Sequence, residues 1–370
     1  MDLNLFFDLF AKDIQWIREK TIYLAVHGSK AYGTNMPESD TDYKGMAICP
    51  KEYYLGFSKH FEQAELKAPN PDCTIFDIKK FFNLASLANP NCLEMLFVEP
   101  EDRMLVSPLG EELLENRNLF LSKKTRWTLQ GYSFAQLKRI KLHRGYLLNP
   151  PKEYPTRASL GLPEQTLIPK DQLAAVEAEI KKEMDKFQFD FLDGLTEPQK
   201  IEIRETMASM LAELKITSED QWLSSARKIG LSDNFILLMQ RERAYANAKR
   251  EWDNYQEWKK NRNPKRAADE AKFGYDGKHA GHLVRLTKMA KELLLTGKMN
   301  VRRPDREELI YIRNGGWSYE QLIEFAEREE KEIDILYNTT NILPKAPDIN
   351  KLNAFCIRLI EKSLSENSAK

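Results

Sequence analysis

The sequence predicts an α+β fold, with a mixed sheet near the N-terminus followed by mostly helical segments. Two observations predict it. Before residue 122, short apolar runs bounded by Gly, Pro or Asp recur, which is typical of strands. After it, such runs nearly vanish and apolar residues follow a helical period instead. The chain of 370 residues is long enough for two or three domains with cores of their own.

The N-terminal third should open with an amphipathic helix over residues 3–19. The run "TIYLAV" at 21–26 predicts a buried strand, and "DYKGMAICP" at 42–50 predicts a second one. A third strand, in "DCTIFDIKKFF" at 72–82, should pass into a helix around Lys79–Leu87.

The remaining chain reads as helical. Residues 122–148 predict one long basic helix that ends at "NPP", and 150–262 begins with a Pro-rich linker and continues as a charged helical insertion. In the last hundred residues, Gly315-Gly316 ends one helix, and Ser318 with Gln321 starts the next. We therefore expect three domains, at 1–121, 122–262 and 263–370.

Composition excludes several classes of protein. The formal net charge is zero, so only a local basic patch could bind nucleic acid. Four cysteines are scattered without a CxxC pair, which argues against a zinc site and a disulfide framework and suits a reducing compartment. The N-terminus lacks the apolar core of a signal peptide and no apolar run spans a bilayer, so we expect a cytoplasmic protein with no membrane partner.

The stretch "HGSKAYGTNMPESDTDYKG" at 27–45 carries the first chemistry. Asp40 and Asp42 are two residues apart, so on a strand their carboxylates would lie on one face. Two such carboxylates repel unless a cation sits between them, and a hard divalent ion, Mg²⁺ or Mn²⁺, resolves the conflict. Gly28 and Ser29 follow a strand, where backbone N–H groups and a hydroxyl can bind phosphate oxygens.

Asp77 is the candidate for the third carboxylate that a two-metal phosphoryl-transfer site requires. It lies among apolar residues, where an aspartate without a partner is costly. The alternative is that Asp77 only caps the helix that follows. A bare D-x-D is a weak signal; the Gly-Ser turn upstream and the later aspartate make it stronger.

The pattern Gly28-Ser29, Ser39-Asp40-x-Asp42 and a later Asp77 resembles the DNA polymerase beta-type nucleotidyltransferase superfamily. More narrowly, "NPNCLEMLF", "YSFAQLKRIKLHR", "GYDGKHAGHLVRL" and "IRNGGWSYEQL" resemble the predicted nucleotidyltransferases of bacteria and phages grouped with the RNA-ligase-associated (RNA repair) nucleotidyltransferases. The resemblance covers 1–150 and 262–370, and implies that 1–121 is the catalytic domain. The family often has Arg where this chain has Lys30, which keeps the charge but loses the bidentate fork.

The segment "YDGKHAGHLVRL" places Lys278, His282 and Arg285 on one stripe of a helix, with His279 at its edge. Four basic or imidazole groups together suggest a wall that faces a triphosphate. The alternative is a solvated basic face, or histidines satisfied in a contact between domains.

In the long helix, Gln136, Arg139 and His143 follow one another at i, i+3 and i+7 and are candidates for the acceptor side of the cleft. A basic helix with nearby aromatic residues could follow a single-stranded nucleic acid. An ordinary amphipathic helix would have the same pattern.

These features together imply an enzyme of the EC 2.7.7 type that moves a nucleoside monophosphate from an NTP, such as ATP, to an acceptor hydroxyl and releases pyrophosphate. An RNA 3′ end is the first choice of acceptor, and a protein hydroxyl (adenylylation) or a small molecule is the alternative. A second alternative is a non-catalytic nucleotide-sensing module, although a sensor needs no third carboxylate. The oligomeric state is not specified by the sequence.

Overall fold

The computed structural model describes residues 3–11, 14–67, 71–189 and 218–366. They form an α+β protein, which confirms the predicted fold class. The chain divides into two units. The first unit comprises Met1–Leu148 and Asn263–Lys370, and the second comprises Asn149–Arg262. Among the described helices, none is long and apolar enough to cross a membrane.

The first unit contains a five-stranded sheet in the order β3-β4-β2-β1-β5. Its strands are β1 (Thr21–His27), β2 (Asp42–Ala47), β3 (Gln63–Leu66), β4 (Cys73–Asp77) and β5 (Arg103–Val106). β2 and β4 are parallel, and the other neighbours are antiparallel. The sheet is therefore mixed, with β2 at its centre between β4 and β1.

Side chains alternate between two cores, one on each face of the sheet. Tyr43 and Ala47 of β2 belong to a smaller core with Phe6 and Phe10 of the first helix. Met46 belongs to the larger core, which the later helices build. The N-terminal helix thus packs in the smaller core, whereas the larger core combines residues from the first half of this unit with residues from its C-terminal helices.

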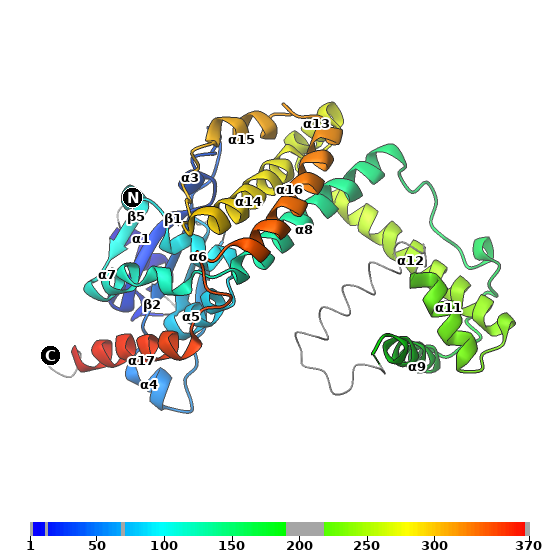
Figure 1. Cartoon of the computed structure of the whole chain (residues 1–370), viewed down its shortest axis with the longest axis horizontal. Coiled ribbons are helices and arrows are strands. Elements are labelled where there is room, and N and C mark those ends of the chain that lie inside the picture. Colours follow the sequence, from blue (N-terminus) through cyan, green and yellow to red (C-terminus); the bar gives the residue numbers. More distant parts are fainter. Residues whose placement is uncertain (1–2, 12–13, 68–70, 190–217, 367–370) are drawn as a thin grey trace. The chain divides into compact units, whose positions relative to one another are not determined.

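The helices of the first unit are α1 (Leu3–Ala11), α2 (Ile17–Lys20), α3 (Gly28–Tyr32), α4 (Lys51–Leu55), α5 (Ile78–Ser86), α6 (Pro90–Leu96), α7 (Pro108–Glu115), α8 (Lys124–Leu148), α13 (Pro264–Phe273), α14 (Gly277–Thr296), α15 (Arg306–Arg313), α16 (Tyr319–Thr339) and α17 (Ile349–Glu366). α14 packs along both α8 and α16, although α8 lies far from them in the sequence (Figure 1). The second unit contains α9 (Lys170–Phe189), α11 (Ser218–Lys228) and α12 (Asp233–Asn261) around a small apolar core. Part of the predicted insertion, 190–217, lies outside the described residues.

Most element predictions are confirmed. The three predicted strands are β1, β2 and β4, and the long helix is α8. Ser318 and Gln321 form the expected capping box at the start of α16. The single helix expected over 3–19 is wrong, because α1 ends at Ala11 and α2 begins at Ile17. β3 and β5 were not predicted; each is only four residues long.

A buried ion pair attaches α14 to the sheet. Arg285 Nη1 of α14 donates to Glu94 Oε1 of α6 at 2.7 Å, and the two residues are 5% and 1% exposed. The Arg285 guanidinium also lies over the Tyr32 ring of α3 at 3.7 Å, and the Tyr32 hydroxyl donates to Glu94 Oε2 at 2.5 Å. His27 Nε2, at the end of β1, lies 3.7 Å from the same oxygen. Four elements therefore meet at one carboxylate.

The charge of Glu94 should contribute strongly to stability. Burial raises its pKa, but the nearby Arg285 and the hydrogen bonds more than offset this, so that the net pKa is lowered. Glu94→Gln leaves the guanidinium buried without a counter-ion, and we expect the free energy of unfolding to fall by about 3–5 kcal/mol. Urea unfolding at neutral pH measures this loss. Because a lowered pKa stabilises the ionised folded form, the difference should shrink as the pH falls.

The matched control is Lys362→Gln, which removes an exposed contact of 2.7 Å with Glu112. It should cost at most about 1 kcal/mol. Equal losses in the two variants would contradict the role assigned to Glu94.

Candidate active site

Gly28 and Asp42 meet where β1 ends and β2 begins. His27 lies opposite Asp42 in the antiparallel pair, so Gly28, the next residue, comes beside the Asp42 side chain. A Cβ atom at Gly28 would overlap Asp42 Oδ2, and Gly28 has a φ of +68°. Both observations require glycine here. The backbone of the Gly-Ser turn therefore directly contacts a carboxylate.

Asp72 brings a further carboxylate to this edge of the sheet. Because β2 and β4 are parallel with Tyr43 opposite Cys73, Asp42 and Asp72 lie at equivalent positions at the start of neighbouring strands. The Tyr43 N–H donates to the Asp72 carbonyl at 2.8 Å, which fixes this register. Adjacent strands are about 4.8 Å apart, so the two side chains are neighbours.

The Asp42 carboxyl is influenced by burial and by the charges of neighbouring side chains. Burial raises the pKa of the Asp42 carboxyl, and the charges of Asp40 and Asp72 raise it further. The ammonium groups of Lys278 and Lys44 act in the opposite direction. Asp40 is exposed and Asp42 is half-buried. The charges of two further carboxylates and two ammonium groups therefore act on the Asp42 carboxyl.

Asp77 does not join this group. It lies opposite Ala47 at the other end of β4, five residues or about 16 Å along the strand from Asp72. Its Oδ1 accepts the N–H of Lys79 at 2.9 Å and so caps α5, and its Oδ2 accepts the Tyr54 hydroxyl at 2.6 Å. The alternative interpretation as a helix cap therefore describes its position, and Asp72, not Asp77, is the aspartate beside Asp42 in the register of the two strands.

Lys44 is a site residue that the sequence reasoning missed. Burial lowers the pKa of its ammonium group, while the carboxylates of Glu94, Asp42 and Asp72 raise it. Lys44 is two residues after Asp42 on β2, so the two side chains lie on the same face. The i, i+2 spacing of Asp42 and Lys44 could have identified Lys44 from the sequence.

Ser29 and Lys30, both half-buried, follow Gly28 in α3. The Ser29 carbonyl accepts the N–H of Thr34 at 2.9 Å. The Lys30 ammonium donates to the hydroxyl of Thr41, between the two aspartates. Lys30 thus holds the loop that carries Asp40, in addition to any contact with phosphate.

Lys278 and His282 of α14 were predicted to face the carboxylates. Lys278 is exposed, and its charge lowers the pKa of Asp42. Burial lowers the pKa of His282 to about 3, and the nearby charges of Arg285 and Lys278 act in the same direction. A lowered pKa favours the neutral imidazole, and a contact between His282 and a triphosphate stays a prediction.

Arg285 and His279 have other partners. The Arg285 guanidinium is buried against Glu94 and Tyr32, and this position corrects the phosphate contact expected from the sequence. His279 Nδ1 lies 2.7 Å from Gln136 Oε1. Gln136 is thus bonded to α14, whereas Arg139 is exposed and lies near enough to lower the pKa of His279.

The repulsion at Asp42 gives a prediction about stability. Because its pKa is raised, the ionised carboxylate is disfavoured in the folded state, and the folded state gains stability as the pH falls. Asp42→Asn should therefore melt at a higher temperature than the unsubstituted protein at pH 7 without divalent cations. The difference should disappear in acid, where Asp42 is protonated. A lower melting temperature for Asp42→Asn at pH 7 would contradict the electrostatic account; differential scanning calorimetry measures both.

Residues 10–147 match a family model, RlaP, described as the RNA repair pathway DNA polymerase beta family. A protein of Enterobacteria phage T4, named as an uncharacterized 38.9 kDa protein in the nrdC-mobD intergenic region, is 34% identical over 90 residues. That alignment covers 22% of this chain and 27% of the phage protein. The family resemblance seen in the sequence is therefore confirmed: residues 10–147 match the RNA repair pathway DNA polymerase beta family, which is consistent with a polymerase beta-type nucleotidyltransferase.

Proposed function

We propose that this protein transfers a nucleoside monophosphate from an NTP to an acceptor hydroxyl, an RNA 3′ end, and releases pyrophosphate. The observation that carries the proposal is the group of Asp40, Asp42 and Asp72 beside the Gly28 backbone. Such a group is unfavourable alone and favourable with a cation and its anionic ligand. The family match supports nucleotidyl transfer in RNA repair.

The donor set of the site fits a hard divalent cation. Asp40, Asp42 and Asp72 offer carboxylate oxygens, the ligands that Mg²⁺ and Mn²⁺ prefer. Burial first and the charges of Asp40 and Asp72 second raise the pKa of Asp42, and a bound cation would stabilise the ionised carboxylate against both. When bound, such a cation neutralises the charge of the triphosphate and orients the reacting oxygens.

The remaining side chains have distinct roles in the proposal. The Gly28 and Ser29 backbone and hydroxyl bind the β- and γ-phosphates, and Lys278 contacts them from α14. The acceptor oxygen attacks the α-phosphorus, the bond to the pyrophosphate oxygen breaks, and the hydroxyl proton passes to the Asp72 carboxylate. Lys44 supports this site by offsetting the negative charge of its carboxylates.

A transfer assay tests the function. The full chain is incubated with each α-labelled NTP, Mg²⁺ or Mn²⁺, and defined RNA, DNA or protein acceptors, and the label in each fraction is measured. We expect labelled RNA 3′ ends. Label in protein or in a small molecule would move the acceptor to the alternatives, and NTP binding without transfer to any acceptor would favour the sensing module.

Asp72→Asn and Asp77→Asn form a matched pair, because both remove one carboxylate from β4 or its start. Asp72→Asn should lower kcat by at least about 100-fold, since it removes a ligand worth several kcal/mol in the transition state. Asp77→Asn keeps a residue that caps helices well and should retain activity near that of the unsubstituted protein. The opposite order of the two activities would restore Asp77 as the third carboxylate.

Lys278→Ala should weaken NTP binding by about 10-fold, because a contact between an ammonium and a phosphate contributes about 1.5 kcal/mol or more. Since Lys278 is exposed, the loss should be largest at low ionic strength. The control is Lys291→Ala, which makes the same change on α14 where the ammonium contacts Glu329 at 2.8 Å. If both variants bind NTP equally well, Lys278 has no phosphate contact; isothermal titration calorimetry with a non-hydrolysable NTP measures the difference.

A further inference from the structure

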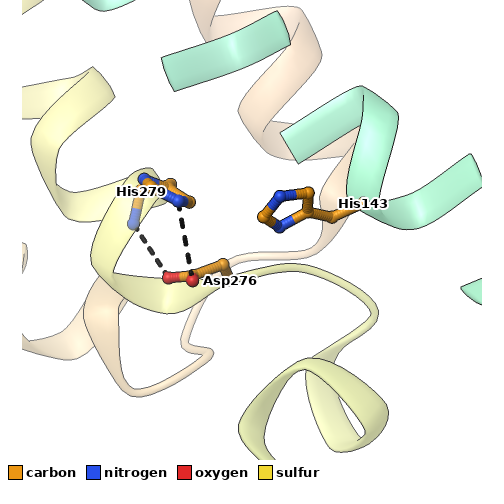
Figure 2. A group of neighbouring side chains, drawn as sticks. All are labelled: His143, Asp276 and His279. Atoms are coloured by element: carbon orange, nitrogen blue, oxygen red, sulfur yellow. Dashed lines mark hydrogen bonds and ion pairs between the residues drawn. The ribbon is translucent and has the colours of Figure 1, made fainter. Parts of the chain in front are cut away.

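A second group of potential metal ligands lies away from Asp42, between α8 and the start of α14. His143 of α8 and Asp276 and His279 at the N-terminus of α14 each offer a ligand atom, and these atoms lie within 4.8 Å of one another. The ring of His143 points toward the other two side chains (Figure 2). The sequence-based argument against a zinc site rested on the spacing of the cysteines. It does not apply here, because this cluster consists of two histidines and an aspartate.

Both histidines have an oxygen acceptor at Nδ1. His143 Nδ1 lies 3.0 Å from Glu270 Oε1, and His279 Nδ1 lies 2.7 Å from Gln136 Oε1. A carboxylate or amide oxygen can only accept, so in the neutral imidazole Nδ1 carries the proton and Nε2 carries the lone pair. Histidines that bind a metal ion through one ring nitrogen usually donate the N–H of the other ring nitrogen to an oxygen in this way.

The two carboxylate oxygens of Asp276 have different neighbours. Oδ1 accepts the N–H of His279 at 3.1 Å and caps α14. Oδ2 lies 3.7 Å from His279 Nε2, so it shares the space into which that lone pair points. The side chain of Asp276 is buried, 4% exposed, and its ionised form requires a positive partner there.

Arg266 of α13 supplies that positive charge. Its Nη2 lies 2.6 Å from Asp276 Oδ2 and 3.4 Å from His279 Nε2, the two atoms that a metal would use. The Arg266 side chain is 40% exposed and ends a long flexible stem. A guanidinium in this position is a competitor that can withdraw toward solvent when a metal ion binds.

We propose that His143, Asp276 and His279 bind a divalent transition metal ion, with zinc as the best fit, in exchange for Arg266. Two imidazole nitrogens and one carboxylate oxygen, with a fourth position for water, form a three-ligand zinc set. Zinc ligands at about 2.0–2.1 Å require the three atoms to approach more closely than 4.8 Å, a movement of side chains alone. Magnesium, which prefers six oxygens, suits the Asp42 site and not this one.

The site would link α8 to the first turn of α14, one residue from Lys278. Bound zinc would therefore fix the start of the helix that contributes to the proposed nucleotide site. This inference does not depend on the proposed function, because its readout is the binding of metal.

The test uses the full chain, stripped with a chelator and dialysed, and titrated with Zn²⁺ by calorimetry and with Co²⁺ by visible absorption. With Mg²⁺ present in excess to occupy the carboxylate site at Asp42, we expect one ion per chain, with the visible bands of tetrahedral cobalt. His143→Ala and His279→Ala should abolish this binding, and Asp276→Asn should do so while keeping a capping residue on α14. His60→Ala, an exposed histidine elsewhere, is the control that should bind normally.

Two further variants separate metal binding from a structural network. Glu270→Gln removes the charged acceptor of His143 and should weaken Zn²⁺ binding by about 10–100-fold. Arg266→Gln should instead strengthen Zn²⁺ binding, because the competing cation is gone, and should make the gain in melting temperature on adding Zn²⁺ larger. Three results would overturn the proposal: loss of Zn²⁺ affinity in Arg266→Gln, absence of stoichiometric binding, or binding that none of the three ligand variants changes. Because several variants are compared, poor folding of one of them does not decide the outcome.

Discussion

The arrangement of the first unit depends on one buried carboxylate, that of Glu94. It receives Arg285 from α14 and Tyr32 from α3, and it lies near His27 at the end of β1. Isolated, each of these polar groups would be costly in the core; together they compensate one another and lock three elements in one register. Lys278 lies two helical turns, about 10 Å, before Arg285 on α14, so the same interaction determines which helix end reaches Asp42.

The candidate site combines charges that the fold would otherwise avoid. Asp42 is held against Gly28 by the pairing of β1 with β2, and Asp72 is held beside it by the parallel register of β4. Lys44 and Lys278 offset only part of the effect of burial and of the neighbouring carboxylates, because the pKa of Asp42 remains raised. The site therefore retains an affinity for positive charge, which is the property that a cation-dependent nucleotide site needs.

Local patterns in the sequence predicted what local physics decides: three of the strands, the α8 helix and the Ser318 cap. The expectation that Asp40 and Asp42 share one strand is wrong, because β2 begins at Asp42 and Asp40 precedes it. Which aspartate lies near Asp42 depends on the face of the sheet to which each side chain along β4 points. Asp72 has the strand parity of Phe76, which packs in the core on the Met46 side, whereas Asp77 has the opposite parity. Arg285 and His279 could not be assigned from helical spacing, since their partners lie on α6 and α8, distant in the sequence.

The most direct test of the account is anomalous diffraction from crystals of the protein with Mn²⁺ and a non-hydrolysable NTP. The account predicts an anomalous peak among the carboxylates of Asp40, Asp42 and Asp72, with the triphosphate between the Gly28 backbone and Lys278. A peak at Asp77, or a triphosphate bound away from α14, would contradict it.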